Sequence, residues 1–288
     1  MHKPVVTSFL HPASNTFTHV VYDLRTKRAA VIDPVLDFDV ASGRTGKVAL
    51  DAVIGHVRER DLAVDWIIET HLHADHLSGA QHLKSALGGV IAIGEHIAQV
   101  QEIFGELFNS GTDFATDGSQ FDHLFHDDER YNVGNLQAQA LHTPGHTPAC
   151  MSHRIGDALF VGDTIFMPDY GTARCDFPGG DARTLYRSIR RLFELPDDTR
   201  VFLCHDYLPE GRTELQCQTT IGAEKRSNIH IREGISEDEF VRMREARDAT
   251  LAVPRLLLPA VQVNMRAGQW PPADDNGIRY LKIPLDRL

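Results

Sequence analysis

The sequence lacks any apolar run that approaches the roughly 18 residues of a membrane-spanning helix, and its mean hydropathy is −0.25. These two properties exclude a transmembrane helix. Only four of the 288 residues are cysteines, and no two of them form a CxxC pair. Residues 1–14 lack the long apolar segment and the small-residue cleavage site of a signal peptide. We therefore expect free thiols and a cytoplasmic location.

Positive charge is also scarce. The sequence has 29 Lys and Arg residues against 40 Asp and Glu residues, which gives a formal net charge of −11. The overall field of such a protein does not attract nucleic acid or an anionic membrane, so we expect neither as a partner. An anionic substrate would have to be bound by locally placed Arg or Lys side chains.

Histidine, by contrast, is plentiful, with 16 residues. Neutral imidazoles are common metal ligands, so metal chemistry is the first hypothesis to test. Hydrophobic residues make up 42% of the chain, which is ordinary for a globular protein and sufficient for a sizeable core.

Apolar spacing predicts strands and helices that alternate in two halves of the chain. We expect strands at 5–10, 18–24, 29–33, 64–70, 90–93, 136–142, 149–155, 158–162 and 200–203. We expect helices at 47–60, 74–87, 95–108, 182–193 and 236–245, the last opened by a capping box of Ser236 and Glu239. Irregular structure is expected at 109–130 and in the Pro-rich end of the chain. Two sheets packed face to face with outer helices would satisfy this pattern, and so would one doubly wound open sheet.

The most informative motif is His71-Leu72-His73-Ala74-Asp75-His76, which directly follows the expected buried strand 64–70. Residues two apart in an extended segment point the same way, so His71 and His73 share a face. Asp75 and His76 follow where we expect the chain to turn into a helix. A solvated helix start with incidental histidines is the alternative. The close spacing of three imidazoles and a carboxylate favours a metal site instead.

Three further motifs place a polar side chain at the end of an apolar strand. A Pro-Gly turn after Leu141 projects His146, the strand Phe160-Val161 ends in Gly-Asp with Asp163, and the strand 201–203 leads to His205. Each motif alone has an ordinary structural explanation. Together with the first motif they supply, in chain order, His, His, Asp, His, His, Asp and His.

This ligand series resembles that of the metallo-β-lactamase superfamily, and the resemblance extends from about residue 5 to 270. It implies an α/β fold, namely an αββα sandwich of two mixed sheets with helices on the outer faces. It also implies a single domain over 1–288 whose C-terminal tail, about 233–288, closes the active site. Within the superfamily, several segments resemble the persulfide dioxygenases (sulfur dioxygenases), which are related to the hydroxyacylglutathione hydrolases (glyoxalase II): 69–79, 142–148, 174–177, 204–207 and 264–268.

The resemblance implies an Fe(II)-dependent enzyme that oxidises glutathione persulfide with O2 and water to sulfite and glutathione. One iron per chain would be held by His71, His146 and Asp163, which would thereby be the catalytic residues. Two histidines and one carboxylate suit non-haem Fe(II) with open positions. Four more side chains would orient these ligands and ordered water, or hold a second metal: His73, Asp75, His76 and His205. The related hydrolases use these four for a second metal, so a thiolester hydrolase with two zinc ions is the alternative.

The resemblance also implies contacts with the substrate. Arg174 matches the position that meets the glutathione carboxylates, and a guanidinium fits a carboxylate bidentately. Tyr207 matches a tyrosine that lines the same pocket, and Met265 and Arg266 lie where the tail would close the site. A surface ion pair for Arg174 and purely structural roles for the other three are the alternatives. Some members carry a cysteine where this chain has Ala267, so that thiol has no role here.

Members of this fold often pair, so the resemblance implies a homodimer or a higher homo-oligomer. The partners it implies are otherwise small molecules, glutathione persulfide and O2. A non-enzymatic scaffold that had kept only the fold would show degraded ligand motifs, and this sequence shows intact ones.

Overall fold

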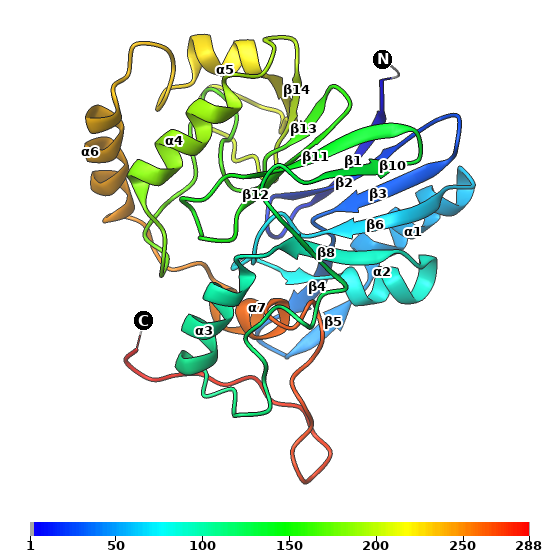
Figure 1. The fold of residues 1–288 in the computed structure, drawn as a ribbon. Helices are drawn as coiled ribbons and strands as arrows, with labels where there is room; N and C mark the ends of the chain where they lie inside the picture. The colour runs from blue at the N-terminus through cyan, green and yellow to red at the C-terminus, as the bar shows by residue number, and fades with distance from the viewer. Residues whose placement is uncertain (1–2, 288) are drawn as a thin grey trace.

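Two six-stranded sheets form the centre of the protein, for which a computed structural model describes residues 3–287 (Figure 1). The first sheet contains, in spatial order, β1 (Val5–His11), β2 (Thr16–Tyr22), β3 (Arg28–Ile32), β6 (Ala63–Ile68), β8 (Val90–Gly94) and β9 (His123–Phe125). The second contains β10 (Arg130–Val133), β11 (Leu136–His142), β12 (Met151–Ile155), β13 (Ala158–Phe160), β14 (Arg200–Phe202) and β15 (Gln218–Thr220). A third, smaller sheet is formed by β5 (Arg44–Gly46), β4 (Val35–Asp39) and β7 (Leu77–Ser78).

Both large sheets are mixed. In the first, β1, β2 and β3 are antiparallel neighbours, whereas β3, β6, β8 and β9 run parallel. In the second, β13 and β14 form the parallel pair and the other neighbours are antiparallel. Parallel neighbours end at the same edge of a sheet, so β3 and β6 in the first sheet and β13 and β14 in the second each bring their carboxyl ends together.

Helices cover the outer face of each sheet (Figure 1). On the side of the first sheet they are α1 (Val48–Glu59), α2 (Ala80–Leu87), α3 (Ile97–Leu107) and α7 (Leu257–Asn264). On the side of the second sheet they are α4 (Ala182–Leu192), α5 (Ile221–Ser227) and α6 (Glu237–Asp248).

The alternation of side chains along the strands explains the layered arrangement. In β2, Val20 packs with the helices of the first sheet, whereas the next residue, Val21, packs between the two sheets. In β14 the order is repeated, with Val201 facing the outer helices and Phe202 facing the other sheet. Each sheet is therefore apolar on both faces, and the expected αββα sandwich is confirmed in place of the doubly wound alternative.

Two of the expected elements differ from the structure. Helix α2 begins at Ala80 and not at Ala74, because the chain over 74–79 forms the metal-motif loop and strand β7. The Pro-rich end, expected to be irregular, contains the buried helix α7. Pro259 is tolerated there because it occupies the first turn, where a backbone N–H has no partner in the helix. The capping box at the start of α6 is confirmed, with Ser236 and Glu239 bonding each other's backbone N–H.

No helix within residues 3–287 combines the length and the apolar character needed to cross a bilayer. All four cysteines have free thiols.

A buried histidine joins the two sheets. His19 on β2 donates a hydrogen bond from Nε2 to the carbonyl oxygen of Leu203, at 2.9 Å, and its Nδ1 accepts one from the Ser8 hydroxyl, at 2.8 Å. The neutral ring satisfies both bonds. Burial lowers the pKa of His19 to about 4, even though the Leu203 carbonyl and Asp33 favour the charged form.

We expect the protein to lose stability as the pH falls from about 6.5 to 4. In this range the unfolded chain protonates His19 whereas the folded chain does not, so acid favours the unfolded state. The stability that this residue contributes is complete above pH 6.5, and about 3 kcal/mol of it is lost by pH 4. Urea unfolding at a series of pH values measures this slope. A His19→Gln variant should have a shallower slope, and a variant of the exposed His126 should keep the slope of the wild type; equal slopes in all three proteins would refute the assignment.

Candidate metal centre

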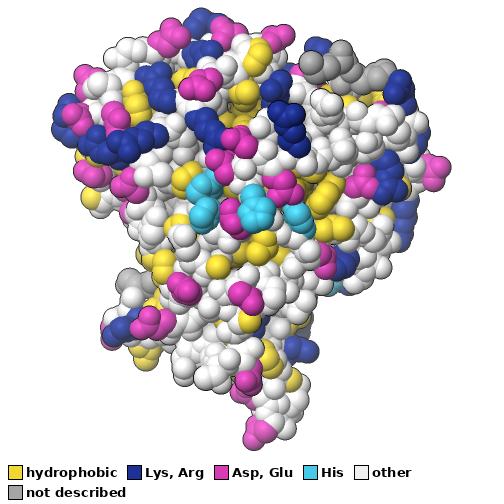
Figure 2. Space-filling view, in the orientation of Figure 1, with side chains coloured by type: hydrophobic (Ala, Val, Ile, Leu, Met, Phe, Trp, Pro, Cys, Tyr) yellow, Lys and Arg dark blue, Asp and Glu magenta, His cyan; other side chains and the backbone are white. Residues whose placement is uncertain are grey.

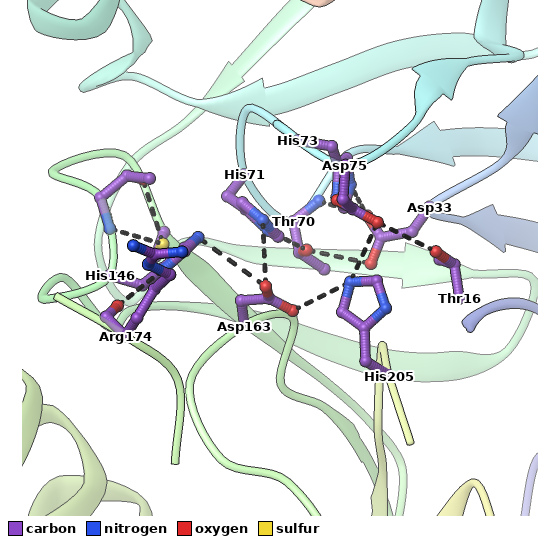
Figure 3. A network of polar contacts seen from close by, with 12 residues as sticks. Thr16, Asp33, Thr70, His71, His73, Asp75, His146, Asp163, Arg174 and His205 are labelled. Atoms are coloured by element: carbon purple, nitrogen blue, oxygen red, sulfur yellow. Dashed lines mark hydrogen bonds and ion pairs between the residues drawn. The ribbon is translucent and has the colours of Figure 1, made fainter. Parts of the chain in front are cut away.

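The four polar motifs converge at one edge of the sandwich (Figure 3). His71 follows β6 of the first sheet, whereas His146, Asp163 and His205 follow β11, β13 and β14 of the second. Their side chains point toward one another, with Asp163 between the imidazoles (Figure 3). The carboxyl ends of strands from both sheets thus build a single site.

His71, His146 and Asp163 form one set of potential ligands. The Nε2 atoms of His71 and His146 lie 3.9 and 3.7 Å from Oδ2 of Asp163, and one ligand atom of each residue lies within 4.8 Å of the others. Both imidazoles are buried. This is the set of two histidines and one carboxylate that the sequence predicts for a single metal ion.

The remaining predicted ligands lie on the other side of Asp163. Nε2 of His205 lies 3.4 Å from Oδ1 of Asp163 and 3.5 Å from Oδ2 of Asp75. His73 forms its own set of potential ligands with Asp75 and His76. The two oxygens of Asp163 therefore face two different groups of donors.

The buried polar atoms in this region fit a bound cation. Among the predicted ligands, five buried atoms have no hydrogen-bond partner within residues 3–287: His71 Nε2, His73 Nδ1, His76 Nε2, His205 Nε2 and Asp163 Oδ1. A buried polar atom without a partner costs free energy, and several such atoms facing one another are explained by an ion that they share. Imidazole nitrogens and a carboxylate suit zinc or iron.

Hydrogen bonds fix the imidazoles in the form that binds metal. Nδ1 of His71 bonds the Thr70 hydroxyl at 3.0 Å, and that hydroxyl donates its own proton to Asp33. Nδ1 of His71 must therefore donate, which leaves Nε2 as the free acceptor. Nδ1 of His146 donates to the Arg174 carbonyl at 2.8 Å, with the same consequence. Burial lowers the pKa of His71 well below its ordinary value, and burial also lowers that of His146, so both rings are neutral at pH 7.

His73 has a different environment. Its Nε2 donates to Asp33 at 2.9 Å and lies 3.3 Å from Glu69. Burial opposes the charged ring, but the two carboxylates outweigh it and raise the pKa of His73 well above its ordinary value. Burial raises the pKa of Glu69, which also accepts a short hydrogen bond from Ser78. Two buried carboxylates, Asp33 and Glu69, thus contact Nε2 of His73, whereas Nδ1 has no hydrogen-bond partner among the described residues.

The parallel pairing of β3 and β6 explains why these acids meet. Ile32 pairs with Ile68, so the next residues, Asp33 and Glu69, leave the sheet side by side. Asp33 then accepts hydrogen bonds from the backbone N–H and the hydroxyl of Thr70, at 2.8 and 2.9 Å. From the sequence, Asp33 is expected only as the end of a strand. Its position before a proline, at the end of an apolar strand, is the signal that could have placed it at this edge.

A second residue without an assigned role, Asn264, shapes the metal-motif loop. From the end of α7, its side-chain NH2 donates to the carbonyl oxygens of His73 and His76, both at 2.8 Å. Its carbonyl oxygen accepts from the backbone N–H of Ser78 at 2.8 Å. These bonds replace the helical bonds expected for residues after 74. No spacing in the sequence indicates a contact across so many residues.

Residue 162 lies beside Thr70 and His71 in the structure, and the close approach of its backbone to Thr70 requires a glycine there. Gly162 has φ +52°, and a Cβ there would lie 2.5 Å from the Thr70 hydroxyl oxygen and 2.8 Å from Cβ of Thr70. Thr70 sets the orientation of His71, so this contact bears directly on the site.

We expect Gly162→Ala to lower metal retention at least about tenfold, because it displaces a group that orients a ligand. Metal content after dialysis against a chelator measures the effect. Gly43→Ala is the matched control, because Gly43 also has a positive φ, +65°, but has nothing within 4 Å of the added Cβ. If both variants retain metal like the wild type, the backbone contact at Gly162 is unimportant for the site.

A cavity of about 330 Å³ opens over the metal cluster and reaches Asp75, His146 and Asp163. In the space-filling view the histidines and their carboxylates lie at the middle of one face, with Lys and Arg side chains gathered above them (Figure 2). The cavity is also lined by Arg174 and Tyr207, as the substrate prediction requires.

The predicted substrate residues differ in their surroundings. Arg174 donates twice to Asp176, at 2.6 Å each, and once to the Ala252 carbonyl at 2.7 Å. Tyr207 stacks on His205 with ring centroids 5.8 Å apart. Met265 is buried in the hydrophobic core, and the Arg266 guanidinium lies over the ring of Phe114 at 4.2 Å. The structure thus brings Arg174 and Tyr207 to the cavity and places Met265 and Arg266 outside its lining; the four substrate roles stay predictions.

Comparison with known proteins agrees with this geometry. The sequence profile of the Metallo-beta-lactamase superfamily matches residues 13–205. A probable metallo-hydrolase of Burkholderia pseudomallei (strain 1710b) is 54% identical, with 98% of this chain and 99% of the relative covered. Glyoxylase B2 of Dictyostelium discoideum is 49% identical over 99% of this chain and 98% of its own length.

Proteins named for dioxygenase activity are more distant. The mitochondrial persulfide dioxygenase ETHE1 of Homo sapiens is 29% identical over 93% of this chain and 90% of its own length. The crystal structure of ETHE1 from Myxococcus xanthus superimposes with a TM-score of 0.73, at 30% identity, covering 92% of this chain and all of that one. The names of the relatives near 50% identity thus favour the hydrolase alternative over the dioxygenase. The profile match, the fold and the donor set agree on the broader assignment: the chain belongs to the metallo-beta-lactamase superfamily.

Proposed function

We propose that the protein is an Fe(II)-dependent persulfide dioxygenase that converts glutathione persulfide, O2 and water to sulfite and glutathione. The observation that carries the proposal is the set formed by His71, His146 and Asp163. Two imidazoles and one carboxylate leave positions free on a ferrous ion for two further ligands. The similarity in fold to ETHE1 from Myxococcus xanthus supports the same proposal.

The residues of this chain would bind and orient. His71, His146 and Asp163 would hold the metal, while Thr70 and the Arg174 carbonyl fix the two rings. Fe(II), when bound, would supply the redox chemistry with dioxygen. Residues 244–255 of the C-terminal tail contribute to the cavity lining, which supports a role for the tail, about 233–288, in closing the site.

A thiolester hydrolase of the glyoxalase II kind is the second candidate. The names of the relatives near 50% identity favour it. The second group of donors on the other side of Asp163, with unpartnered nitrogens on His76 and His205, gives it a place for a second metal. Two metals there would activate a hydroxide for attack on a thiolester.

Metal content and two assays decide between the candidates. We expect protein purified without added metal to carry about one iron per chain, and to consume O2 when glutathione persulfide is added. Two zinc ions per chain, with cleavage of S-lactoylglutathione and no O2 uptake, would establish the hydrolase and refute the dioxygenase. The Asp163→Ala protein serves as the blank in both assays, because it removes the carboxylate common to both sites.

A further inference from the structure

Four arginines line the cavity above the metal cluster: Arg174, Arg244, Arg247 and Arg255. Two of them already form ion pairs with carboxylates of the protein. Arg174 is paired with Asp176, and the buried Arg244 donates to Asp248 at 2.9 Å and to the Thr172 carbonyl at 2.9 Å. Their charges are therefore largely neutralised by partners within the fold.

Arg247 and Arg255 are different. Within residues 3–287, neither has a carboxylate at ion-pair distance and neither guanidinium donates a hydrogen bond, although Arg247 lies 5.8 Å from the ring centroid of Tyr170. Both are exposed at the mouth of the cavity. In a protein with a net charge of −11, two arginines without an ion-pair partner in the described part of the chain form a local attraction for anions beside the site.

Helix α6 holds Arg247 in place relative to the metal ligands. Arg244, one turn earlier, is bonded to Thr172, and Asp248 accepts a hydrogen bond from the backbone N–H of Cys175 at 2.8 Å. The segment 172–175 between these bonds includes the Arg174 carbonyl that orients His146. The position of Arg247 is therefore tied to the segment that positions the metal site.

An aromatic wall connects the two ends of the cavity. Arg247 lies over Tyr170, whose ring centroid is 5.0 Å from that of Tyr207, and Tyr207 in turn stacks on His205. A ligand lying along this wall has a cationic group at one end and the metal donors at the other.

We propose that Arg247 and Arg255 bind the carboxylates of the substrate at the end remote from its reacting sulfur. The substrate class is then a thiol-derived peptide with two carboxylates, held by Arg247 and Arg255, whose donors are free within the residues that the structure describes, in contrast to those of Arg174, which are largely used within the protein. The inference rests on the proposed function for the identity of the reacting group and adds the residues that select the remainder of the molecule.

Binding of S-methylglutathione, an unreactive thioether with both carboxylates, tests the inference by calorimetry on the metal-loaded enzyme. We expect Arg247→Gln and Arg255→Gln each to weaken binding about tenfold, because each removes a charge-assisted hydrogen bond to a carboxylate. Arg242→Gln is the matched control, because Arg242 is exposed on the same helix but does not line the cavity. The dimethyl ester of the same ligand should bind weakly to the wild type. Its affinity for the two arginine variants should be equally weak.

Equal affinity of the wild type and both arginine variants for S-methylglutathione would overturn the inference, and so would failure of the wild type to bind it. This test involves no turnover, so it is separate from the test of the dioxygenase reaction. A protein that consumes no O2 but shows the arginine-dependent affinity would refute the proposed reaction and keep the carboxylate site.

Discussion

Asp163→Ala is expected to remove the bound metal and to reduce activity at least about 100-fold, whichever metal the site holds. Oδ2 of Asp163 lies 3.9 and 3.7 Å from Nε2 of His71 and His146, and Oδ1 lies 3.4 Å from Nε2 of His205. The side chain is thus common to both groups of donors. Its loss breaks a single-ion site and a two-ion site alike.

Elemental analysis of the purified variant measures the metal, and circular dichroism establishes that the protein is folded. Asp238→Asn, a change in a carboxylate that is 70% exposed on α6, should keep the metal content of the wild type. His71→Ala should lose the metal in the same way as Asp163→Ala. A variant of either residue with full metal and full activity would contradict the ligand assignment.

The second large effect is expected for Asp33→Ala, which should destabilise the protein by about 3 to 5 kcal/mol. Asp33 is buried and accepts hydrogen bonds from the backbone and hydroxyl of Thr70 and from His73. Its loss leaves a buried imidazole, whose pKa is raised well above its ordinary value, without its principal counter-charge. It also frees the Thr70 hydroxyl that orients His71, so metal affinity should fall about 10- to 100-fold.

Urea unfolding of metal-free protein measures the first effect, and competition with a chelator measures the second. Asp61→Ala provides a matched control, since Asp61 and Asp33 have the same unusual backbone angle, φ +53° and +52°, and Asp61 is exposed. The Asp61→Ala control should be destabilised by about 1 kcal/mol or less, which is the cost of placing alanine in this left-handed backbone conformation. A loss of equal size in both variants would show that the buried hydrogen bonds of Asp33 do not stabilise the fold.

The sequence could indicate where the candidate metal ligands meet because these residues follow strands. A strand places successive residues on opposite faces and ends at a sheet edge, so polar residues after apolar strands indicate an edge site. The motif 71–76 and the strand ends at His146, Asp163 and His205 were identifiable in this way. In the structure they converge on Asp163, whose oxygens lie 3.7 Å from His146 and 3.4 Å from His205.

The expected start of the helix at residue 74 was wrong for a tertiary reason, although the helix itself is present as α2 over Ala80–Leu87. Apolar spacing there is compatible with a helix, but the carbonyl oxygens of His73 and His76 accept hydrogen bonds from Asn264 on α7. A side chain about 190 residues away thus takes the place of the local bonds of a first turn. No local pattern contains that information, because the competing partner lies on another element.

The amino-acid sequence alone indicated the superfamily and predicted the metal donors, because the strand pattern and the order of His and Asp residues are local properties; the layer order was implied by the resemblance, since the strand pattern also allowed a doubly wound sheet. Only the tertiary structure decided which acids hold His73, which residue shapes the metal-motif loop and which arginines at the cavity have no ion-pair partner among the described residues. Those properties depend on partners brought together from distant segments. Arg174 and Arg247 have the same side chain, but Arg174 is paired with Asp176 and bonded to the Ala252 carbonyl, whereas Arg247 has no carboxylate at ion-pair distance within residues 3–287.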